Sequence, residues 1–450
     1  MTRLVMASTL YGAATAVAAI DADPLPVEEQ VLVIANTGVV PETTRPFTET
    51  PGFAALRESF DRIVSWNDVV APYHPSIWAP RRQDRRLWRR LLMRAWELDR
   101  PPSRIVLESL AVAPARTVAE IFEDTPLSCY ADGLMAYGPT RNRLPTELGG
   151  RVTELLYPDL LPGVTPLLLS EHRVPSARIE TSALSRVHDR IAVEVPATPE
   201  PALDLAPTRP ALVVGQYLSA LGIVTPEQEG LLHAEMLDAV VAAGHESVVF
   251  APHPLAPRAL TEPMTLAARR YGITFASTST PIPAESLVRR LQPRLVVGCF
   301  STALATARLA GAPVATLGTE PVLAALTPYQ NSNRVPASLV DATVPSLVGS
   351  SELLDRTLVP ELLTAVGYCM QPRTYPHLRD RAAEFLDWHL DERTARYFRR
   401  RRLTALGLPG RDGWHRRALA RRRTAGQLVR RRSAAVAWAS RGLVRAVVRG

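Results

Sequence analysis

The stretch "ALVVGQYLSALGIVTPEQEGLLHAEMLDAVVAAGHESVVFAPHP" (residues 211–254) decides the fold class. The segments "ALVVGQ" (211–216) and "SVVFAP" (247–252) are short apolar runs, typical of strands that are buried on both faces. The segment between them, residues 225–244, has the length and composition of a helix. A strand, a helix and a second strand in this order predict a parallel sheet that is covered by helices.

Both ends of that helix carry the expected signals. Thr225 followed by Pro226 and Gln228 predicts a capping box, and Gly244 predicts the helix end. The same alternation continues to residue 318 and also occurs near the start of the chain, where a strand, a helix and a strand are predicted at "LVMAST" (4–9), "GAATAVAAI" (12–20) and "VLVIANT" (31–37). The class is therefore α/β.

A proline-rich segment divides the chain. At 450 residues and 46% hydrophobic content, the protein can bury two ordinary cores. The segment "EVPATPEPALDLAPTRP" holds five prolines that discourage helix and sheet. We therefore predict an α/β domain at residues 1–195, a linker at 196–210, a second α/β domain at 211–395 and a basic helical tail at 396–450.

Cysteine usage and hydropathy bear on the compartment. The three cysteines are widely spaced and in no metal-binding pattern, which predicts free thiols in a reducing compartment: Cys129, Cys299 and Cys369. No run of apolar residues is long enough for a membrane span. The apolar stretch after Arg3 also imitates a signal peptide, but the strand–helix–strand interpretation is favoured.

Polar residues follow the ends of two predicted strands. His253 lies after "SVVFA" between Pro252 and Pro254, and Gly215 and Gln216 end "ALVVGQ". In parallel α/β sheets, ligands bind beyond the carboxyl ends of the strands, so these residues are expected to face a ligand. The alternative is that His253 is an ordinary turn residue.

Two helix starts carry groups suited to a nucleotide. Ser301 and Thr302 lie where a strand passes into a helix, so that hydroxyls and unpaired N–H groups would attract a phosphate. Glu285 lies in the first turn of another predicted helix, where a carboxylate either accepts ribose hydroxyls or balances the helix dipole. The alternative for Ser301 or Thr302 is a simple helix cap.

The first half of the chain offers a candidate base. In "CYADGLMAYGPTR" (129–141), Asp132 precedes Gly133 in a predicted tight turn at the domain edge. A carboxylate there can reach into a cleft and take a proton from an alcohol. An Asp-Gly pair is also among the commonest turns, which leaves a purely structural interpretation open.

Taken together, "YADG" (130–133), "PHP" (252–254) and "FST" (300–302) resemble the motifs of bacterial sialyltransferases, most closely the α-2,8-polysialyltransferase-like group. The motifs of that group are an acidic pair followed by Gly, a His-Pro, and a Ser-Ser or Ser-Thr. In this chain Ala131 replaces the first acid. Further similar segments extend the resemblance over roughly residues 1–345: "STLYGAATAVAAI" (8–20), "YPDLLPGVTPLL" (157–168) and "PYQNSNRVP" (328–336).

The resemblance implies a GT-B fold, in which two Rossmann-like domains face each other across a central cleft. It implies an inverting glycosyltransferase that moves sialic acid, or a related nonulosonic acid, from a CMP-activated donor to a hydroxyl of a glycan or glycolipid acceptor. No cofactor and no metal ion are expected, because no Asp-x-Asp signature occurs in a suitable place; "DAD" (21–23) follows a helix of the first domain.

The resemblance also assigns roles. Asp132 would deprotonate the acceptor hydroxyl, and His253 would stabilise the charge that develops on the CMP phosphate. Hydrogen-bond donors aimed at such charge are worth about 3 kcal/mol each. The expected nucleotide-binding residues are Gly215, Gln216, His253, Pro254, Glu285, Ser301 and Thr302, with Asn331, Asn333 and Arg334 near them.

The net charge of +8 is unevenly distributed. Residues 396–450 contain 17 arginines and one acid, Asp412, so this tail carries +16 and the rest of the chain −8. Apolar residues alternate with the arginines as in amphipathic helices, which predicts binding to an anionic membrane. We therefore expect a cytoplasmic enzyme at the inner face of the cell membrane. A solvated tail is the alternative, and nucleic-acid binding is not expected, because no recognition motif accompanies the charge.

Two other functions stay open. The loss of the first acid at Ala131 is compatible with a catalytically inactive homologue that binds a glycan or a nucleotide. The predicted fold is also compatible with a GT-B transferase that uses a UDP- or GDP-sugar.

Overall fold

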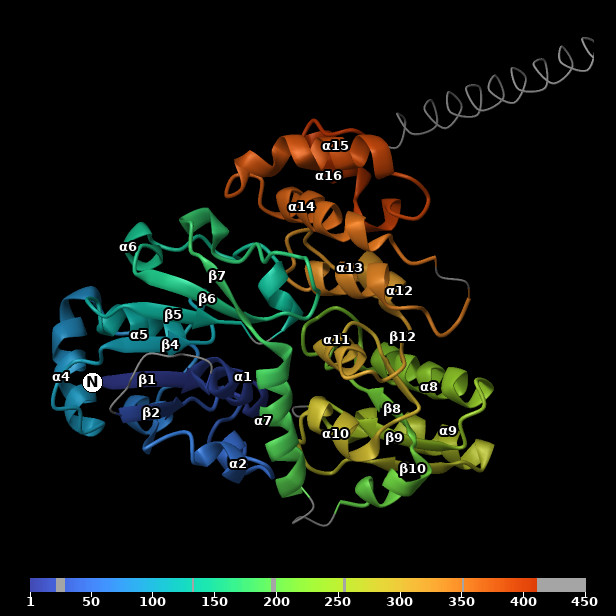
Figure 1. Ribbon diagram of the computed structural model, residues 1–450, viewed down its shortest axis with the longest axis horizontal. Coiled ribbons are helices and arrows are strands. Elements are labelled where there is room, and N and C mark those ends of the chain that lie inside the picture. Colours follow the sequence, from blue (N-terminus) through green and yellow to red (C-terminus); the bar gives the residue numbers. More distant parts are fainter. Residues whose placement is uncertain (22–28, 132, 196–199, 254–255, 350–351, 411–450) are drawn as a thin grey trace, which may run out of the picture.

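Two parallel β-sheets organise the computed structural model (Figure 1). The structure describes residues 1–21, 29–131, 133–195, 200–253, 256–349 and 352–410. The predictions for Asp132, for Pro254 and for most of the basic tail, residues 411–450, lie outside the described residues.

The first sheet has seven strands in the order β3-β2-β1-β4-β5-β6-β7. Its strands are β1 (Thr2–Ala7), β2 (Glu29–Ile34), β3 (Arg62–Ser65), β4 (Arg104–Leu107), β5 (Leu127–Tyr130), β6 (Val152–Pro158) and β7 (Ser176–Ile179). Its helices are α1 (Leu10–Asp21), α2 (Ala54–Arg57), α3 (Trp66–Val70), α4 (Arg85–Ala95), α5 (Ala115–Ile121), α6 (Thr146–Gly149) and α7 (Thr181–Glu194).

The start of the chain lies in the core of this first domain. The apolar residues of β1 are fully buried, and small alanines let α1 pack closely on the sheet. The predicted strand–helix–strand unit is therefore confirmed.

The second sheet has five strands in the order β10-β9-β8-β11-β12. Its strands are β8 (Ala211–Val214), β9 (Ser247–Ala251), β10 (Thr274–Ser277), β11 (Leu295–Gly298) and β12 (Val314–Thr316). The helices that follow the linker are α8 (Pro226–Ala242), α9 (Glu262–Tyr271), α10 (Ala284–Leu291), α11 (Thr302–Leu309), α12 (Thr319–Ala325), α13 (Arg334–Thr343), α14 (Val359–Met370), α15 (Arg379–His389) and α16 (Arg400–Ala405).

The local signals in the second half have the predicted effects. The Thr225 hydroxyl accepts the Gln228 N–H at 3.2 Å, and the Gln228 side chain accepts the Thr225 N–H at 2.9 Å, so the capping box forms. Gly244 and Gly272 follow α8 and α9 with φ of 87° and 65°, a conformation that favours glycine.

Each sheet has a switch point, where the strand order reverses direction. It lies between β1 and β4 in the first sheet and between β8 and β11 in the second. Ligands of α/β proteins bind at the carboxyl ends of the strands at such points. The predicted class, two Rossmann-like domains in a GT-B arrangement, is confirmed, and the two switch points are where functional residues should gather.

The described part of the linker, residues 200–210, is more ordered than its composition predicts. Residues Leu203–Thr208 form a 3₁₀ helix that includes Pro207, so the expectation of no helix is wrong there. The buried carboxylate of Glu200 accepts hydrogen bonds from the N–H and hydroxyl groups of Ser279 and Thr280. The linker is thereby fastened to the loop between β10 and α10.

The C-terminal helices pack back onto the first domain. The hydroxyl of Tyr375, a fully buried side chain, contacts three groups of the first domain. It accepts the Thr140 N–H at 3.0 Å, lies 3.0 Å from the Leu167 carbonyl and lies 2.7 Å from the Glu171 carboxylate. The helical region after the second sheet therefore joins the two domains.

Candidate active site

The switch point of the second sheet is built around Gln216. Its side-chain carbonyl accepts the Phe300 N–H at 2.7 Å and so ties the end of β8 to the end of β11. Gly215, just before it, packs so tightly that a Cβ would lie 2.9 Å from the Phe250 ring and 3.2 Å from Pro252 Cα. A glycine at this position therefore leaves room for the Phe250 ring.

Ser301 and Thr302 lie at the start of α11, as the sequence indicated. The Ser301 hydroxyl caps the helix by accepting the Ala303 N–H at 3.2 Å, so the capping interpretation describes one of its contacts. The Thr302 hydroxyl faces the other domain, where it accepts the Leu134 N–H at 3.2 Å. Because a hydroxyl that accepts a hydrogen bond keeps its own proton, both groups can still donate to a ligand.

The Asp-Gly segment of the first domain therefore meets the Ser-Thr segment of the second. Gly133 is buried against Thr302, and a Cβ on Gly133 would lie 2.6 Å from the Thr302 hydroxyl oxygen. The Ala131 N–H donates to the Leu156 carbonyl at 2.9 Å, which fixes the residue on the other side of Asp132. Two of the three motifs are thus brought together across the domain boundary.

His253 follows β9 on the far side of β8. Its ring centroid lies 6.2 Å from that of Tyr217. Desolvation lowers the pKa of His253 below its ordinary value of 6.5, and the negative charge of Glu229 partly opposes this. The buried Glu229 carboxylate accepts hydrogen bonds from Leu218 and Ser219 and so shapes the loop after β8.

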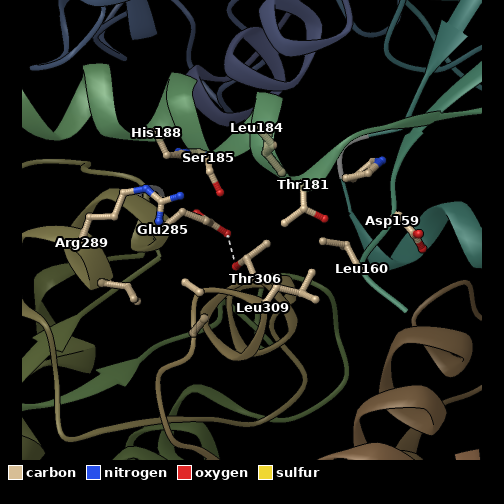
Figure 2. Close-up of a pocket in the computed structure, with 14 residues that line it drawn as sticks. Asp159, Leu160, Thr181, Leu184, Ser185, His188, Glu285, Arg289, Thr306 and Leu309 are labelled. Carbon is tan, nitrogen blue, oxygen red and sulfur yellow. Dashed lines mark hydrogen bonds between the residues drawn. The ribbon is translucent and has the colours of Figure 1, made fainter. Parts of the chain in front are cut away.

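Glu285 lies in the first turn of α10, as predicted, and lines a small pocket. Figure 2 shows Glu285 and Arg289 of α10 facing Ser185 and His188 of α7 across this pocket. The Glu285 carboxylate accepts the Thr306 hydroxyl at 3.1 Å. Thr306 lies one turn after the start of α11, so the pocket is one helical turn from the interdomain contact.

His188 was not selected from the sequence, yet it forms part of the pocket wall. Burial lowers its pKa from 6.5 to about 3, with a smaller contribution from the charge of Arg289. The ring stacks on Tyr11 of α1 at 5.7 Å. It is therefore neutral at physiological pH and belongs to the packing between the two domains.

Three candidates lie at the start of α13 and form contacts within the protein. Arg334 is 1% exposed and donates to the carbonyl groups of Tyr329 and Leu326 at 2.9 and 2.8 Å. Its guanidinium also lies 4.2 Å from the centre of the Tyr329 ring. The Asn331 side chain accepts the N–H of Asn333 at 3.0 Å. These contacts shape the segment at the start of α13.

Two polar residues at the first switch point were not predicted from the sequence. Glu108 directly follows β4 and accepts hydrogen bonds from the Ser8 N–H and hydroxyl at 3.1 and 2.9 Å. The Tyr130 hydroxyl donates to the Met6 carbonyl at 3.0 Å. A polar residue directly after the buried run "RIVL" was the available signal for Glu108.

In the described part of the chain, no group of three or more His, Cys, Asp or Glu side chains is arranged to hold a metal ion. No helix there is long and apolar enough to cross a membrane. All three cysteines are buried free thiols, as predicted.

Comparisons with known proteins identify relatives. A family model described as alpha-2,8-polysialyltransferase matches residues 3–319, more than two thirds of the chain. A search of curated proteins found no match. Similar solved structures include a Photobacterium damselae sialyltransferase GT-B domain, at 11% identity over 75% of this chain and 95% of that one, with a TM-score of 0.38. A putative UDP-N-acetylglucosamine 2-epimerase from Listeria monocytogenes is 11% identical over 87% and 98% of the two chains, with a TM-score of 0.42.

Proposed function

Because the chain belongs to the alpha-2,8-polysialyltransferase family, it is a glycosyltransferase, and we propose that it transfers sialic acid or a related nonulosonic acid from a CMP-activated donor to a glycan hydroxyl. The observation that carries this proposal is the contact between Leu134 and Thr302. It joins the segment with the candidate base to the segment with the candidate phosphate-binding hydroxyls.

The donor phosphate is assigned to the carboxyl edge of the second sheet. Ser301 and Thr302 have hydroxyl protons to donate, and the first N–H groups of α11 have no partner within the helix. His253 follows β9, which β8 separates from β11. His253 and Ser301 thus follow the carboxyl ends of two strands of the same sheet, and the donor phosphate is proposed to bind between them.

In the proposed reaction, Asp132 accepts the proton of the acceptor hydroxyl as that oxygen attacks the anomeric carbon of the donor. The bond to CMP breaks on the opposite face, so the configuration inverts. Desolvation lowers the pKa of His253, and its imidazole is proposed to stabilise the departing phosphate through an N–H group. Phosphate binding would in turn raise the pKa of His253, because a negative charge favours the imidazolium.

Glu285 is proposed to complete the nucleotide site. It lies in the first turn of α10 and is linked to α11 through Thr306. A carboxylate in this position can accept hydrogen bonds from the ribose hydroxyls of the donor. Gly215 and Gln216 hold the backbone on which the nucleotide would lie, since their own contacts are within the second domain.

The reaction is proposed to need neither a cofactor nor a metal ion. The support for this is chemical: hydroxyl donors, an imidazole N–H and the start of α11 are all suited to the charge that develops on the CMP phosphate. The acceptor is proposed to be a glycan or glycolipid. The arginine-rich tail, residues 396–450, is proposed to hold the enzyme at the anionic inner face of the cell membrane.

The central test is release of CMP from CMP-sialic acid in the presence of glycolipid extract, measured with added chelator. Wild-type protein should turn over, and Asp132→Ala should lose at least 100-fold in rate, in the range of general-base catalysis. Asp132→Asn is the matched control, because it keeps the size of the side chain. Equal absence of turnover in all three proteins would instead indicate a binding homologue.

A second measurement tests the donor. Thermal unfolding is followed with CMP, UDP and GDP at equal concentrations. A ligand present at 100 times its Kd stabilises the protein by about 2.7 kcal/mol, which is easily observed. Stabilisation by UDP or GDP but not by CMP would overturn the donor assignment and leave the glycosyltransferase assignment intact.

A further inference from the structure

Helix α4 (Arg85–Ala95) exposes an unusual face to solvent. Leu87 and Leu91, one turn apart, are 58% and 44% exposed. Beside them, Arg86, Arg90 and Arg94 form an exposed row with a spacing of four residues. Large apolar side chains are therefore aligned next to a line of positive charge. We call these five side chains the α4 face.

The charge of this region differs from that of its surroundings. Residues 81–100 contain eight arginines and three acids, a net charge of +5, whereas residues 1–395 carry −8. Arg85 and Arg89 form ion pairs with Glu120 and Asp124 of the α5 region. Within the described part of the chain, no ion pair involves the three arginines of the α4 face.

An open apolar groove lies beside the α4 face. It runs between α4, α3 (Trp66–Val70) and the edge strand β3 (Arg62–Ser65), and the polar side chains of Ser65 and Asp68 also line it. Leu91 belongs both to the α4 face and to the groove wall. The other apolar side chains that line the groove are Ile63, Val64, Val69, Trp88, Ala95 and Trp96.

Aromatic side chains pack α4 onto the first domain. The ring of Trp88 lies 4.5 Å from that of Trp78, and Trp66 contacts both Trp78 and Trp96. Such aromatic packing fixes the orientation of α4 on the domain. Leu87 and Leu91 therefore lie on the solvent side of a helix that is packed onto the domain.

The position of α4 fits an external contact. Figure 1 shows α4 at the outer side of the first domain, beside the N-terminus and away from the second sheet. The loop before it carries further exposed apolar side chains, Tyr73 and Ile77, at 64% and 81%. None of these residues belongs to the candidate active site.

We propose that the α4 face docks on an anionic lipid bilayer, with the leucines in the boundary between headgroups and acyl chains. Interfacial helices combine apolar side chains with arginines in this way, and the arginines pair with lipid phosphates. A second copy of the chain is a poorer occupant, because a two-fold contact would place the same arginine row against itself. The groove can take an acyl chain at the contact.

This inference does not depend on the chemistry of the donor. It adds a folded membrane contact in the first domain to the contact proposed for the arginine-rich tail. Two contacts would fix the orientation of the enzyme at the bilayer, whereas one tail would only hold it near.

The test uses the full-length protein with a single reporter. All three native cysteines are buried, so Leu87→Cys provides a selective attachment point for a polarity-sensitive fluorophore. Leu231→Cys, at a leucine of α8 that is 63% exposed, is the matched control in the second domain. Vesicles of phosphatidylcholine with 30 mol% phosphatidylglycerol are compared with vesicles of phosphatidylcholine alone.

With anionic vesicles, the label at residue 87 should shift to shorter wavelength and be quenched by brominated acyl chains, whereas the label at residue 231 should change little. The proposal is overturned if the protein does not bind these vesicles, or if bound protein shows no shift at residue 87 or equal shifts at both sites. A shift without vesicles that grows with protein concentration would identify a second copy as the occupant instead.

Charge variants give an independent measurement. The triple variant Arg86→Gln, Arg90→Gln and Arg94→Gln should lower the vesicle partition coefficient by about fivefold for each arginine. The matched control removes the same charge at exposed positions of the second domain: Arg258→Gln, Arg269→Gln and Arg270→Gln. Equal losses in the two triple variants would mean that net charge alone drives binding and would refute a docking face on α4.

Discussion

The contact between Gly133 and Thr302 leaves no room for a side chain at residue 133. Gly133 has φ of −168° and ψ of −163°, an extended conformation open to any residue, so backbone strain does not require a glycine. The space does: an added Cβ would lie 2.6 Å from the Thr302 hydroxyl oxygen and 3.4 Å from both Cβ and Cγ2. Rotating the threonine side chain away would break its hydrogen bond with the Leu134 N–H.

The expected cost of Gly133→Ala follows from this geometry. Forcing a methyl group into packed surroundings costs about 1–3 kcal/mol. Thr302→Ala alone leaves the buried Leu134 N–H without its acceptor, which also costs about 1–3 kcal/mol. In the double variant the clash with the hydroxyl is gone, so the two costs should not add. We expect a favourable coupling of at least about 1 kcal/mol.

The assay is a double-mutant cycle that measures urea unfolding and CMP release for all four proteins. Gly133→Ala should unfold at lower urea concentration and lose most of its activity, because the two motifs can no longer approach. The double variant should recover part of the stability but not the activity, since Thr302 is also a proposed phosphate ligand. A Gly133→Ala protein with wild-type stability, or additive losses in the cycle, would refute the proposed contact.

Three further substitutions test other parts of the site. Gln216→Ala leaves the Phe300 N–H unpaired and should lower the unfolding free energy by about 1–3 kcal/mol; unchanged urea stability would contradict this. Gly215→Ala sets a Cβ 2.9 Å from the Phe250 ring and should cost about 1–3 kcal/mol in the same measurement. His188 has a folded pKa of about 3, so the unfolded state alone takes up its proton below pH 6.5, and stability is lost as the pH falls through 6.5 towards 3. Between pH 7 and 5 this loss should be about 2 kcal/mol, and His188→Gln should remove it from the urea profile.

The sequence predicted the fold well because its signals are local. Capping residues, glycines at helix ends and short apolar runs each depend on neighbours only a few positions away. The helix predicted at residues 225–244 matches α8 (Pro226–Ala242) to within two residues. The 3₁₀ helix around Pro207 escaped prediction because it depends on tertiary packing rather than on proline content.

The site was predicted less completely, because spatial contacts decide what a side chain does. Ser301 and Thr302 look equivalent in the sequence, yet one caps its own helix and the other reaches the opposite domain. Arg334 carries a charge suited to a phosphate, but buried carbonyl groups take its hydrogen bonds. Glu108 was recognisable only by applying the strand-end rule equally to the first domain.

A hydroxyl group suits residue 302 because it can accept one hydrogen bond and donate another. Its oxygen accepts the Leu134 N–H from the first domain, so its proton is left to donate to a ligand on the second. An alanine could do neither, and a carboxylate could accept but would repel a phosphate. The same oxygen would thus contact both the first domain and the donor. Under the proposed function, donor binding and the contact between the two domains would share this one oxygen.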